Sequence, residues 1–317
     1  MSVARTVVKN SGILMTVEIL TRLTSVVLTV AIARTLGPAD FGLFNYAFSL
    51  GGLLGILAMF GMDTLVTRDV ARDRARTGSY LGSVLTIEIV FSLVAVAAIA
   101  VILIALGEPL ERIAIVLMAG GIMLLESFIR LIACVFRAYQ HMEYEALVRT
   151  FLRILNVAIC LAVLSLGYGL VGLMIAQFSV FVAALTLSLF IVRGRIARPQ
   201  FDLRWQPHLA ILRAAVPFAL ALAFINVYQR FGIIVLNNVW GDAVTGWYSG
   251  AGTFTRVFDF IPTSLEGALL PAMTALQASS REAWQEAYRR SMKYLLLIAL
   301  PIAIGLAMRS QDFVHLL

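Results

Sequence analysis

The stretch Leu36-Gly37-Pro38-Ala39-Asp40-Phe41-Gly42-Leu43-Phe44-Asn45-Tyr46-Ala47 returns later in the chain as Trp240-Gly241-Asp242-Ala243-Val244-Thr245-Gly246-Trp247-Tyr248-Ser249-Gly250-Ala251. Each copy lies in a short break between two long apolar segments. Internal repeats of this kind are typical of membrane transporters in which one half moves against the other. This repeated stretch, which we call the echo, therefore predicts two related lobes, each of which begins with the same pair of helices.

The composition is that of an integral membrane protein. Apolar residues make up 61% of the chain and charged residues only 14%, whereas soluble domains carry about 25% charged residues. The apolar runs reach the roughly 20 residues that a helix needs to cross a bilayer. We expect about nine spans, at residues 11–35, 43–62, 81–106, 113–135, 151–167, 170–192, 210–236, 246–270 and 293–308.

These features predict an all-α fold, a polytopic membrane helical bundle with two pseudo-repeated lobes. The first lobe, residues 1–192, would contain six helices, and the Pro- and Arg-containing stretch 193–209 would be a cytoplasmic amphipathic linker. Residues 210–317 would form a partial second lobe of three helices. Because a complete second repeat needs six helices, we expect this chain to be incomplete at its C-terminus.

The basic residues give the expected orientation. Most of the 25 Lys and Arg residues lie at the N-terminus and in alternate connections, and only Arg34, Arg112 and Arg309 lie on the opposite side. This asymmetry follows the positive-inside rule and predicts a cytoplasmic N-terminus. It also explains the net charge of +7 without a nucleic-acid partner. The expected outward connections, among them 36–42 and 237–245, are too short to form a catalytic domain, so we expect no enzyme.

Patterns of soluble enzymes and metal sites are missing from the sequence. Cys134 and Cys160 lie inside expected spans, without a neighbouring C-x-x-C or Cys/His pattern. No phosphate-binding loop, nucleophile elbow or H-E-x-x-H motif occurs. We therefore expect no catalytic residue, no metal site and no cofactor, and the sequence leaves coupling to Na+ or H+ open.

Ionisable residues inside the spans are the most specific functional signal, because a charge in the bilayer normally faces a cavity, a partner or water. Helical spacing puts a first polar stripe on one face of the first span, and a second stripe on one face of the eighth. The seventh span adds a third group. These three sets are Glu18, Arg22, Ser25 and Thr29; Ser249, Thr253, Arg256, Asp259, Thr263 and Glu266; and Asn226, Gln229, Arg230 and Asn237.

A structural interpretation competes with the functional one for several of these charges. Two pairs have the spacing of self-neutralising ion pairs that stabilise helix packing, namely Glu18 with Arg22, and Arg256 with Asp259. Arg230 has no acidic residue within one turn, which favours a cavity role.

Charged residues in the other spans of the first lobe also allow both a functional and a structural interpretation. Glu88 stands alone in the third span and would either take up a coupling proton or pair with a partner that the sequence does not identify. For Glu126 and Arg130, near the cytoplasmic end of the fourth span, we favour a structural role.

Several stretches resemble bacterial polysaccharide and oligosaccharide-lipid flippases, the O-antigen type within the multidrug/oligosaccharidyl-lipid/polysaccharide exporter superfamily. The resemblance is carried by six stretches spread over the chain. They are Thr21-Arg22 with Ala33-Arg34-Thr35-Leu36-Gly37-Pro38-Ala39-Asp40-Phe41-Gly42, Tyr46-Ala47, the arginine loop at 68–76, Phe136-Arg137-Ala138, and Leu212-Arg213-Ala214-Ala215-Val216-Pro217. Members of that family usually have 12 to 14 helices in two lobes, so about nine spans are a departure from the pattern.

The resemblance implies a carrier in the bacterial cytoplasmic (inner) membrane. It would move a polyprenyl-diphosphate-linked oligosaccharide from the cytoplasmic to the outer leaflet by alternating access, beside membrane lipids, a polysaccharide polymerase and glycosyltransferases. Arginine suits this substrate because its guanidinium group binds phosphate through several hydrogen bonds. The expected cavity residues are Arg22, Arg230, Arg256, Asn226 and Gln229, with Glu18, Asp259 and Glu88 as charge partners or ion-coupling groups.

Other functions remain open on the sequence alone. A lipid II flippase would differ mainly in its substrate. A drug or organic-cation antiporter of the same superfamily would need net acidic residues in the cavity, and here the arginines mildly favour an anionic substrate. A membrane glycosyltransferase or polymerase would need catalytic residues on sizeable outer loops. A scaffold that transports nothing would tolerate loss of the intramembrane arginines.

Overall fold

The structure of the chain is a computed structural model, in which every regular element of the described residues is a helix. The described residues are 3–197, 205–258, 273, 281–309 and 311. Within them, the side chains of 3–24, 56–57, 205–208, 210, 254 and 256–257 are not described. The expected all-α fold is confirmed for this part of the chain.

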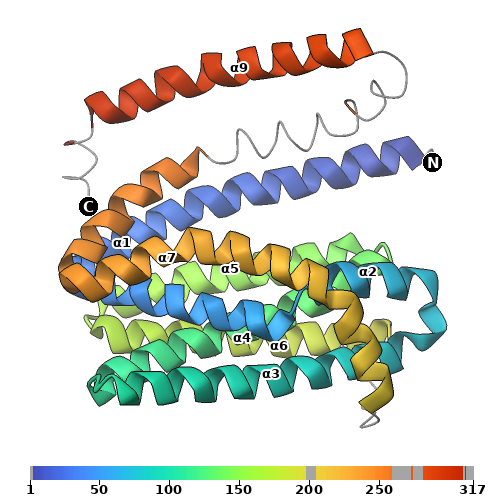
Figure 1. Cartoon of the computed structure of the whole chain (residues 1–317), viewed down its shortest axis with the longest axis horizontal. Helices are drawn as coiled ribbons and strands as arrows, with labels where there is room; N and C mark the ends of the chain where they lie inside the picture. The colour runs from blue at the N-terminus through green and yellow to red at the C-terminus, as the bar shows by residue number, and fades with distance from the viewer. Residues whose placement is uncertain (1–2, 198–204, 259–272, 274–280, 310, 312–317) are drawn as a thin grey trace.

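Long helices dominate the architecture, and seven of them in the described part are long and apolar enough to cross a membrane. Figure 1 shows them stacked side by side. In chain order the elements are α1 (Val3–Met59), α2 (Met62–Arg72), η1 (Arg74–Arg76), α3 (Thr77–Ala105), α4 (Leu110–Ala138), α5 (Met142–Ser165), α6 (Gly169–Arg195), α7 (Trp205–Val257) and α9 (Arg281–Met308).

Two of these helices, α1 and α7, each contain two of the expected spans. Each departs from helical geometry at one glycine, Gly37 with φ 77° and ψ 174° and Gly241 with φ 82° and ψ −177°. A positive φ is accessible to glycine because it has no Cβ. Pro38 then opens the second half of α1, at the first helical position, where its missing N–H is not needed. Both helices turn back on themselves at these kinks (Figure 1).

The structure therefore corrects the expected connections 36–42 and 237–245, because apart from one glycine in each the chain stays helical. The nine expected spans correspond to the seven long helices of the described residues, since α1 and α7 account for two spans each. The expected eighth span, 246–270, lies outside the described residues from position 259 onward. The expected linker 193–209 likewise includes residues 198–204, which are not described.

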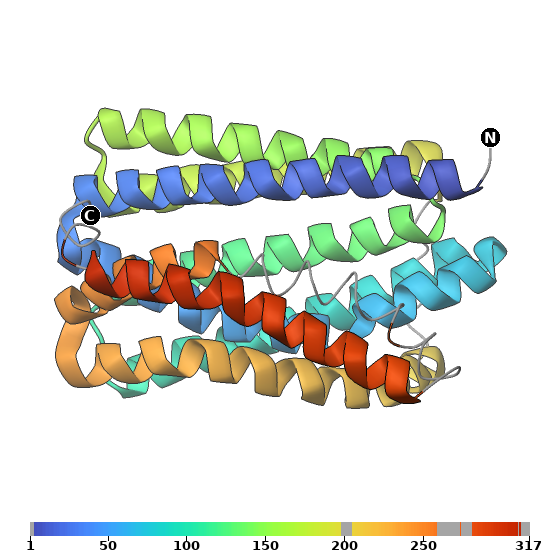
Figure 2. The ribbon, with the colours of Figure 1, turned by 90° about the horizontal axis from the view of Figure 1, so that it is seen from above.

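The first lobe is built around α4, which packs against α1, α2, α3, α5 and α6. Its fully buried side chains include Ile122, Leu131 and Phe136. The amphipathic α2 turns Leu65 and Val66 into the same core, so its apolar face is covered by protein. By contrast, α9 has no buried residue among those described. Figure 2 shows α5 and the first half of α1 along one side of the bundle and α7 along the other. The second half of α1 packs against both α4 and α7, since a Cβ on Gly51 would meet the α4 backbone and a Cβ on Gly52 would meet Arg230 of α7.

The two ends of the bundle differ in chemistry. One end carries the turns at Gly37 and Gly241, and we call it the kink end. The other carries α2, η1 and the last turns of α4 and α6, with their arginines, and we call it the basic end. The basic-end arginines on these elements are Arg68, Arg72, Arg74, Arg76, Arg137, Arg193 and Arg195.

Candidate substrate cavity

The two copies of the echo meet face to face at the kink end. A Cβ on Gly42 would collide with the backbone carbonyl of Asp242, and a Cβ on Gly246 would collide with the backbone carbonyl of Pro38. Gly42 is equivalent to Gly246 in the repeat, and Pro38 is equivalent to Asp242. The contact is thus reciprocal, as at an interface between two identical subunits related by a two-fold axis. Glycine at both positions lets the two backbones touch.

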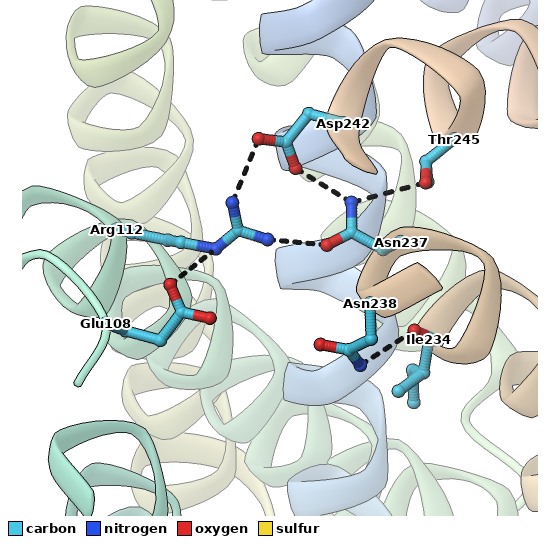
Figure 3. A network of polar contacts seen from close by, with 7 residues as sticks. All are labelled: Glu108, Arg112, Ile234, Asn237, Asn238, Asp242 and Thr245. Carbon is cyan, nitrogen blue, oxygen red and sulfur yellow. Dashed lines mark hydrogen bonds and ion pairs between the residues drawn. The ribbon is translucent and has the colours of Figure 1, made fainter. Parts of the chain in front are cut away.

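A polar network ties the first lobe to α7 beside this contact (Figure 3). Arg112, at the start of α4, donates from Nη1 to Asp242 Oδ2 at 2.9 Å and from Nη2 to Asn237 Oδ1 at 2.5 Å. Its Nε lies 3.3 Å from Glu108 Oε2, and its guanidinium carbon lies 4.9 Å from the centre of the Tyr46 ring. One side chain therefore joins α1, α4 and α7.

Asn237 is buried and completes this network from within α7. Its Nδ2 donates to Asp242 Oδ1 at 2.8 Å and to Thr245 Oγ1 at 3.2 Å. The amide thus bridges the two halves of α7 across the kink at Gly241. Backbone contact and side-chain network together close the kink end.

A small cavity lies between α1, α4 and α7, farther from the kink end. It has a volume of about 160 Å³, and we call it the inter-repeat cavity. Arg230 enters it from α7 and donates from Nη1 to the Phe48 carbonyl at 2.9 Å. The guanidinium group lies against Gly52, where a Cβ would collide with it. Its Nε is buried without a hydrogen-bond partner among the described residues.

Asp63 lines the same cavity from the start of α2. Its Oδ1 is buried and has no hydrogen-bond partner among the described residues. Burial raises the pKa of this carboxyl, and the guanidinium groups of Arg130 and Arg137 oppose that rise. The cavity therefore combines a cation on α7 with an acid on α2 and the pair Glu126 and Arg130 on α4.

A larger cavity of about 700 Å³ lies inside the first lobe, between α4, α5 and α6, and we call it the arginine cavity. Four arginines and two glutamates line it among apolar side chains. On α4 the charged positions follow a helical stripe, and on α5 they recur at every fourth residue. They are Glu126, Arg130 and Arg137 on α4, and Glu145, Arg149 and Arg153 on α5.

Glu145 is the best satisfied acid of the arginine cavity. Its Oε1 lies 2.7 Å from Arg149 Nη2, and its Oε2 lies 3.3 Å from Arg137 Nε. Arg153 donates to the hydroxyl of Ser25 on α1. Arg130 forms no ion pair with the residues that the structure describes. Since Glu126 and Arg130 line both cavities, these two residues mark the junction between them.

The structure places some of the expected site residues and leaves others untested. Arg230 and Asn226 both line the inter-repeat cavity. Gln229 is exposed and lines neither cavity. Glu88 is wholly buried, accepts a hydrogen bond from Ser127, and also lines neither cavity.

The remaining expected residues cannot be placed. The side chains of Glu18, Arg22 and Arg256, and the whole of Asp259, lie outside the described residues. Among the residues that are described, no group of three or more His, Cys, Asp or Glu side chains is arranged to hold a metal ion.

Two features of the site were missed by sequence reasoning. Arg137, Arg149 and Arg153 belong to the basic residues behind the expected orientation, and Arg137 also to the family resemblance, but none of them was expected to line a cavity. Their spacing on neighbouring helices could have identified a shared face. Arg112 was treated as a lone charge on the outward side. The replacement of Pro38 by an acid, Asp242, in the second copy of the echo was the signal for its partner.

Comparisons with known proteins agree with this architecture. The chain is similar to the inward-facing conformation of a multidrug resistance MATE family transporter of the MOP superfamily, with TM-score 0.68, 18% identity, and 93% of this chain and 72% of that chain covered. The outward-facing conformation of such a transporter gives TM-score 0.54 and 18% identity over 95% and 70% of the two chains.

A third similar structure is a MOP superfamily transporter from Pyrococcus furiosus, with TM-score 0.51, 16% identity, and 95% and 70% of the two chains covered. No curated protein sequence matches the chain. The family model described as "Polysaccharide biosynthesis protein" matches residues 7–277. With this match over most of its length and a MATE-like fold, the chain belongs to the polysaccharide biosynthesis (O-antigen flippase) family of MOP-superfamily membrane transporters.

Proposed function

We propose that this protein moves a polyprenyl-diphosphate-linked oligosaccharide from the cytoplasmic to the outer leaflet of the bacterial inner membrane, for polysaccharide biosynthesis. One observation carries the proposal: two neighbouring cavities, which share Glu126 and Arg130 among their lining residues, lie away from a kink end that is closed by reciprocal backbone contact. A closed end opposite a charged cavity is the arrangement expected of one state of an alternating-access carrier.

The orientation follows from the charge distribution. Under the positive-inside rule the basic end, and with it the N-terminus, faces the cytoplasm. The kink end then faces outward. Substrate would enter from the cytoplasmic side, where Arg137 and Arg149 are 38% and 50% exposed, and would leave after the kink end opens. The lipid tail would stay in the bilayer throughout.

The charge of the cavities supports an anionic substrate. A diphosphate that leaves bulk water needs cationic partners, and arginine offers five N–H donors in a planar array. A cation antiporter would need the opposite balance. The similar transporter from Pyrococcus furiosus is itself described as having a binding pocket of reverse polarity that suggests a different function. The fold thus accommodates more than one pocket polarity.

Partners and energy source belong to the same proposal. Glycosyltransferases would make the lipid-linked glycan, and a polysaccharide polymerase would use it after transfer. Transport would be driven by Na+ or H+, with Glu88 among the groups proposed for coupling.

The proposal is tested with Arg230→Ala in the intact protein, expressed in a strain that lacks the gene. We expect normal membrane insertion and a loss of surface polysaccharide of about tenfold, since a buried charge-assisted contact is worth about 1.5–3 kcal/mol. Arg213→Ala, at an exposed position on the same helix, is the matched control. Full surface polysaccharide with Arg230→Ala would contradict the proposal. A cell-wall growth defect on deletion would instead favour lipid II as the substrate.

A further inference from the structure

We propose that the arginine cavity is a binding site for a diphosphate group, separate from the inter-repeat cavity that Arg230 lines. The inference rests on the proposed function, in which the transported lipid carries a diphosphate, and it names the side chains that hold that group. It assigns a second anion contact to α4 and α5 of the first lobe, in addition to the one expected at Arg230.

The charge balance of the cavity favours an anion of more than one charge. Four arginines face two glutamates among the lining residues. Glu145 is shared by Arg137 and Arg149, so one carboxylate partly neutralises two guanidinium groups. Among the lining residues that the structure describes, the arginines therefore outnumber the glutamates.

The cavity is lined by apolar side chains but is open to solvent. Ile129, Phe136, Leu152 and Phe181 line it beside the arginines. Because Arg130 and Arg149 are exposed, an anion bound here would need several charge-assisted hydrogen bonds acting together. The volume of about 700 Å³ also falls within the range of roughly 300–1,000 Å³ that is usual for small-molecule sites.

The depth of the cavity suits a headgroup that enters from the basic end. Arg130 lies eight residues before the end of α4 at Ala138, a distance of about 12 Å along the helix. Arg153 lies eleven residues after the start of α5 at Met142, or about 16 Å. A diphosphate bound between them would lie beside Glu126 and Arg130, the residues that lead into the inter-repeat cavity.

Glu145 acts as an internal anion that competes with the ligand. Its side chain is only 5% exposed and holds Arg137 and Arg149 in place when no substrate is bound. A guanidinium group has five donors, so each arginine can bind a phosphate oxygen while it still contacts Glu145. Removing the charge of Glu145 should therefore tighten binding, whereas a merely structural Glu145 predicts weaker binding.

The experiment measures equilibrium binding to the purified intact protein in detergent or in nanodiscs. The probes are inorganic pyrophosphate and farnesyl diphosphate, which share the diphosphate group but differ in the lipid. We expect both to bind and to compete with each other. We expect Arg149→Ala combined with Arg153→Ala to weaken both by at least about tenfold, and Glu145→Gln to tighten both by about threefold. Arg195→Ala, at an exposed position on α6, should leave binding unchanged.

Three outcomes would overturn the inference. They are binding that the double arginine variant leaves unchanged, weaker binding in Glu145→Gln, and displacement of pyrophosphate by nanodiscs of phosphatidylglycerol, which would identify a general phospholipid site. A failure of the proposed function gives a different result from a failure of the proposed site. If the cavity binds diphosphates as expected but the intact protein does not export glycan, the function is wrong and the site stands. If export continues in the double variant, the site is wrong and the function stands.

Discussion

At the scale of single residues, Arg112 is the clearest case of a side chain that joins distant parts of the chain. Its guanidinium contacts Asp242, Asn237 and Glu108 and lies over Tyr46. The side chains of Arg112 and Asp242 are 20% and 27% exposed, so the ion pair is only partly screened by solvent. Partial burial strengthens the attraction and also adds a desolvation cost, so the coupling free energy of the pair, and not its burial, measures its contribution.

We predict that Arg112→Ala and Asp242→Asn are not additive. Each single change should destabilise the closed kink end, and the double variant should lose little more than either single one, with a coupling free energy of roughly 0.5–3 kcal/mol. Thermal unfolding of the detergent-solubilised protein measures this. Glu111→Gln, at an exposed neighbour of Arg112, is the control. Fully additive losses would show that the pair does not act as a unit.

A second residue-level prediction concerns Asp63. Since burial raises its pKa above the ordinary value of 3.8, the stability it contributes is complete below that value and is lost as the pH rises through the folded-state pKa. In a series of pH values that begins below 3.8 and rises above it, the melting temperature of the unchanged protein should therefore fall relative to that of Asp63→Asn. Asp40→Asn, at an exposed position, is the control. A constant difference across this range would contradict the assignment.

At the scale of elements, the kinked helices α1 and α7 show which features of the fold could be predicted from the sequence and which could not. The repeated stretch predicted the positions of both turns, and the length of the apolar runs predicted the helices. The connections were misjudged because Gly37 and Gly241 are the only residues of α1 and α7 that leave helical geometry. A hydropathy pattern does not distinguish a short loop from a helix that turns at one residue.

The arginine cavity was missed for a different reason. The positions of Arg149 and Arg153 are plain in the sequence, but whether that face of α5 meets α4, α6 or lipid depends on how the helices pack. Interhelical packing of this kind leaves no local signal. Arg230, by contrast, was identified because it is isolated inside an apolar span and has no acid within one turn.

The two classes of glycine in α1 should respond differently to alanine. Gly37→Ala meets no atom within 4 Å but strains a backbone with φ 77° and ψ 174°, at a cost of about 1–3 kcal/mol. Gly42→Ala collides with the Asp242 backbone, which should cost about 1–3 kcal/mol and also separate the repeats. Thermal unfolding measures the first effect, and the accessibility of a cysteine introduced at Asp242 measures the second.

A control for these variants is Gly194→Ala, which meets open space on a helix. It should be neutral or stabilising, by up to about 1 kcal/mol. If Gly42→Ala opened the kink end no more than Gly37→Ala, the reciprocal contact would not be what closes it.

At the scale of the whole molecule, the two repeats share a backbone plan but differ in chemistry. They turn at equivalent glycines and meet at equivalent glycines. The charged cavities, however, are built from α4 and α5 of the first lobe and from Arg230 of α7. A symmetric contact can open and close as a unit, while asymmetric cavities hold an asymmetric substrate. Opening the kink end is the step that this account requires for transport.

The most direct test holds the kink end closed. Arg112→Cys and Asp242→Cys in the intact protein would be joined by a short, reducible bis-thiosulfonate, and transfer of a polyprenyl-diphosphate oligosaccharide between leaflets would be measured in proteoliposomes. The protein's own Cys134 and Cys160 are buried, and the protein without added cysteines controls for their reaction. The account predicts transfer in the reduced variant, none after cross-linking, and recovery after reduction. Undiminished transfer by the fully cross-linked protein would contradict it.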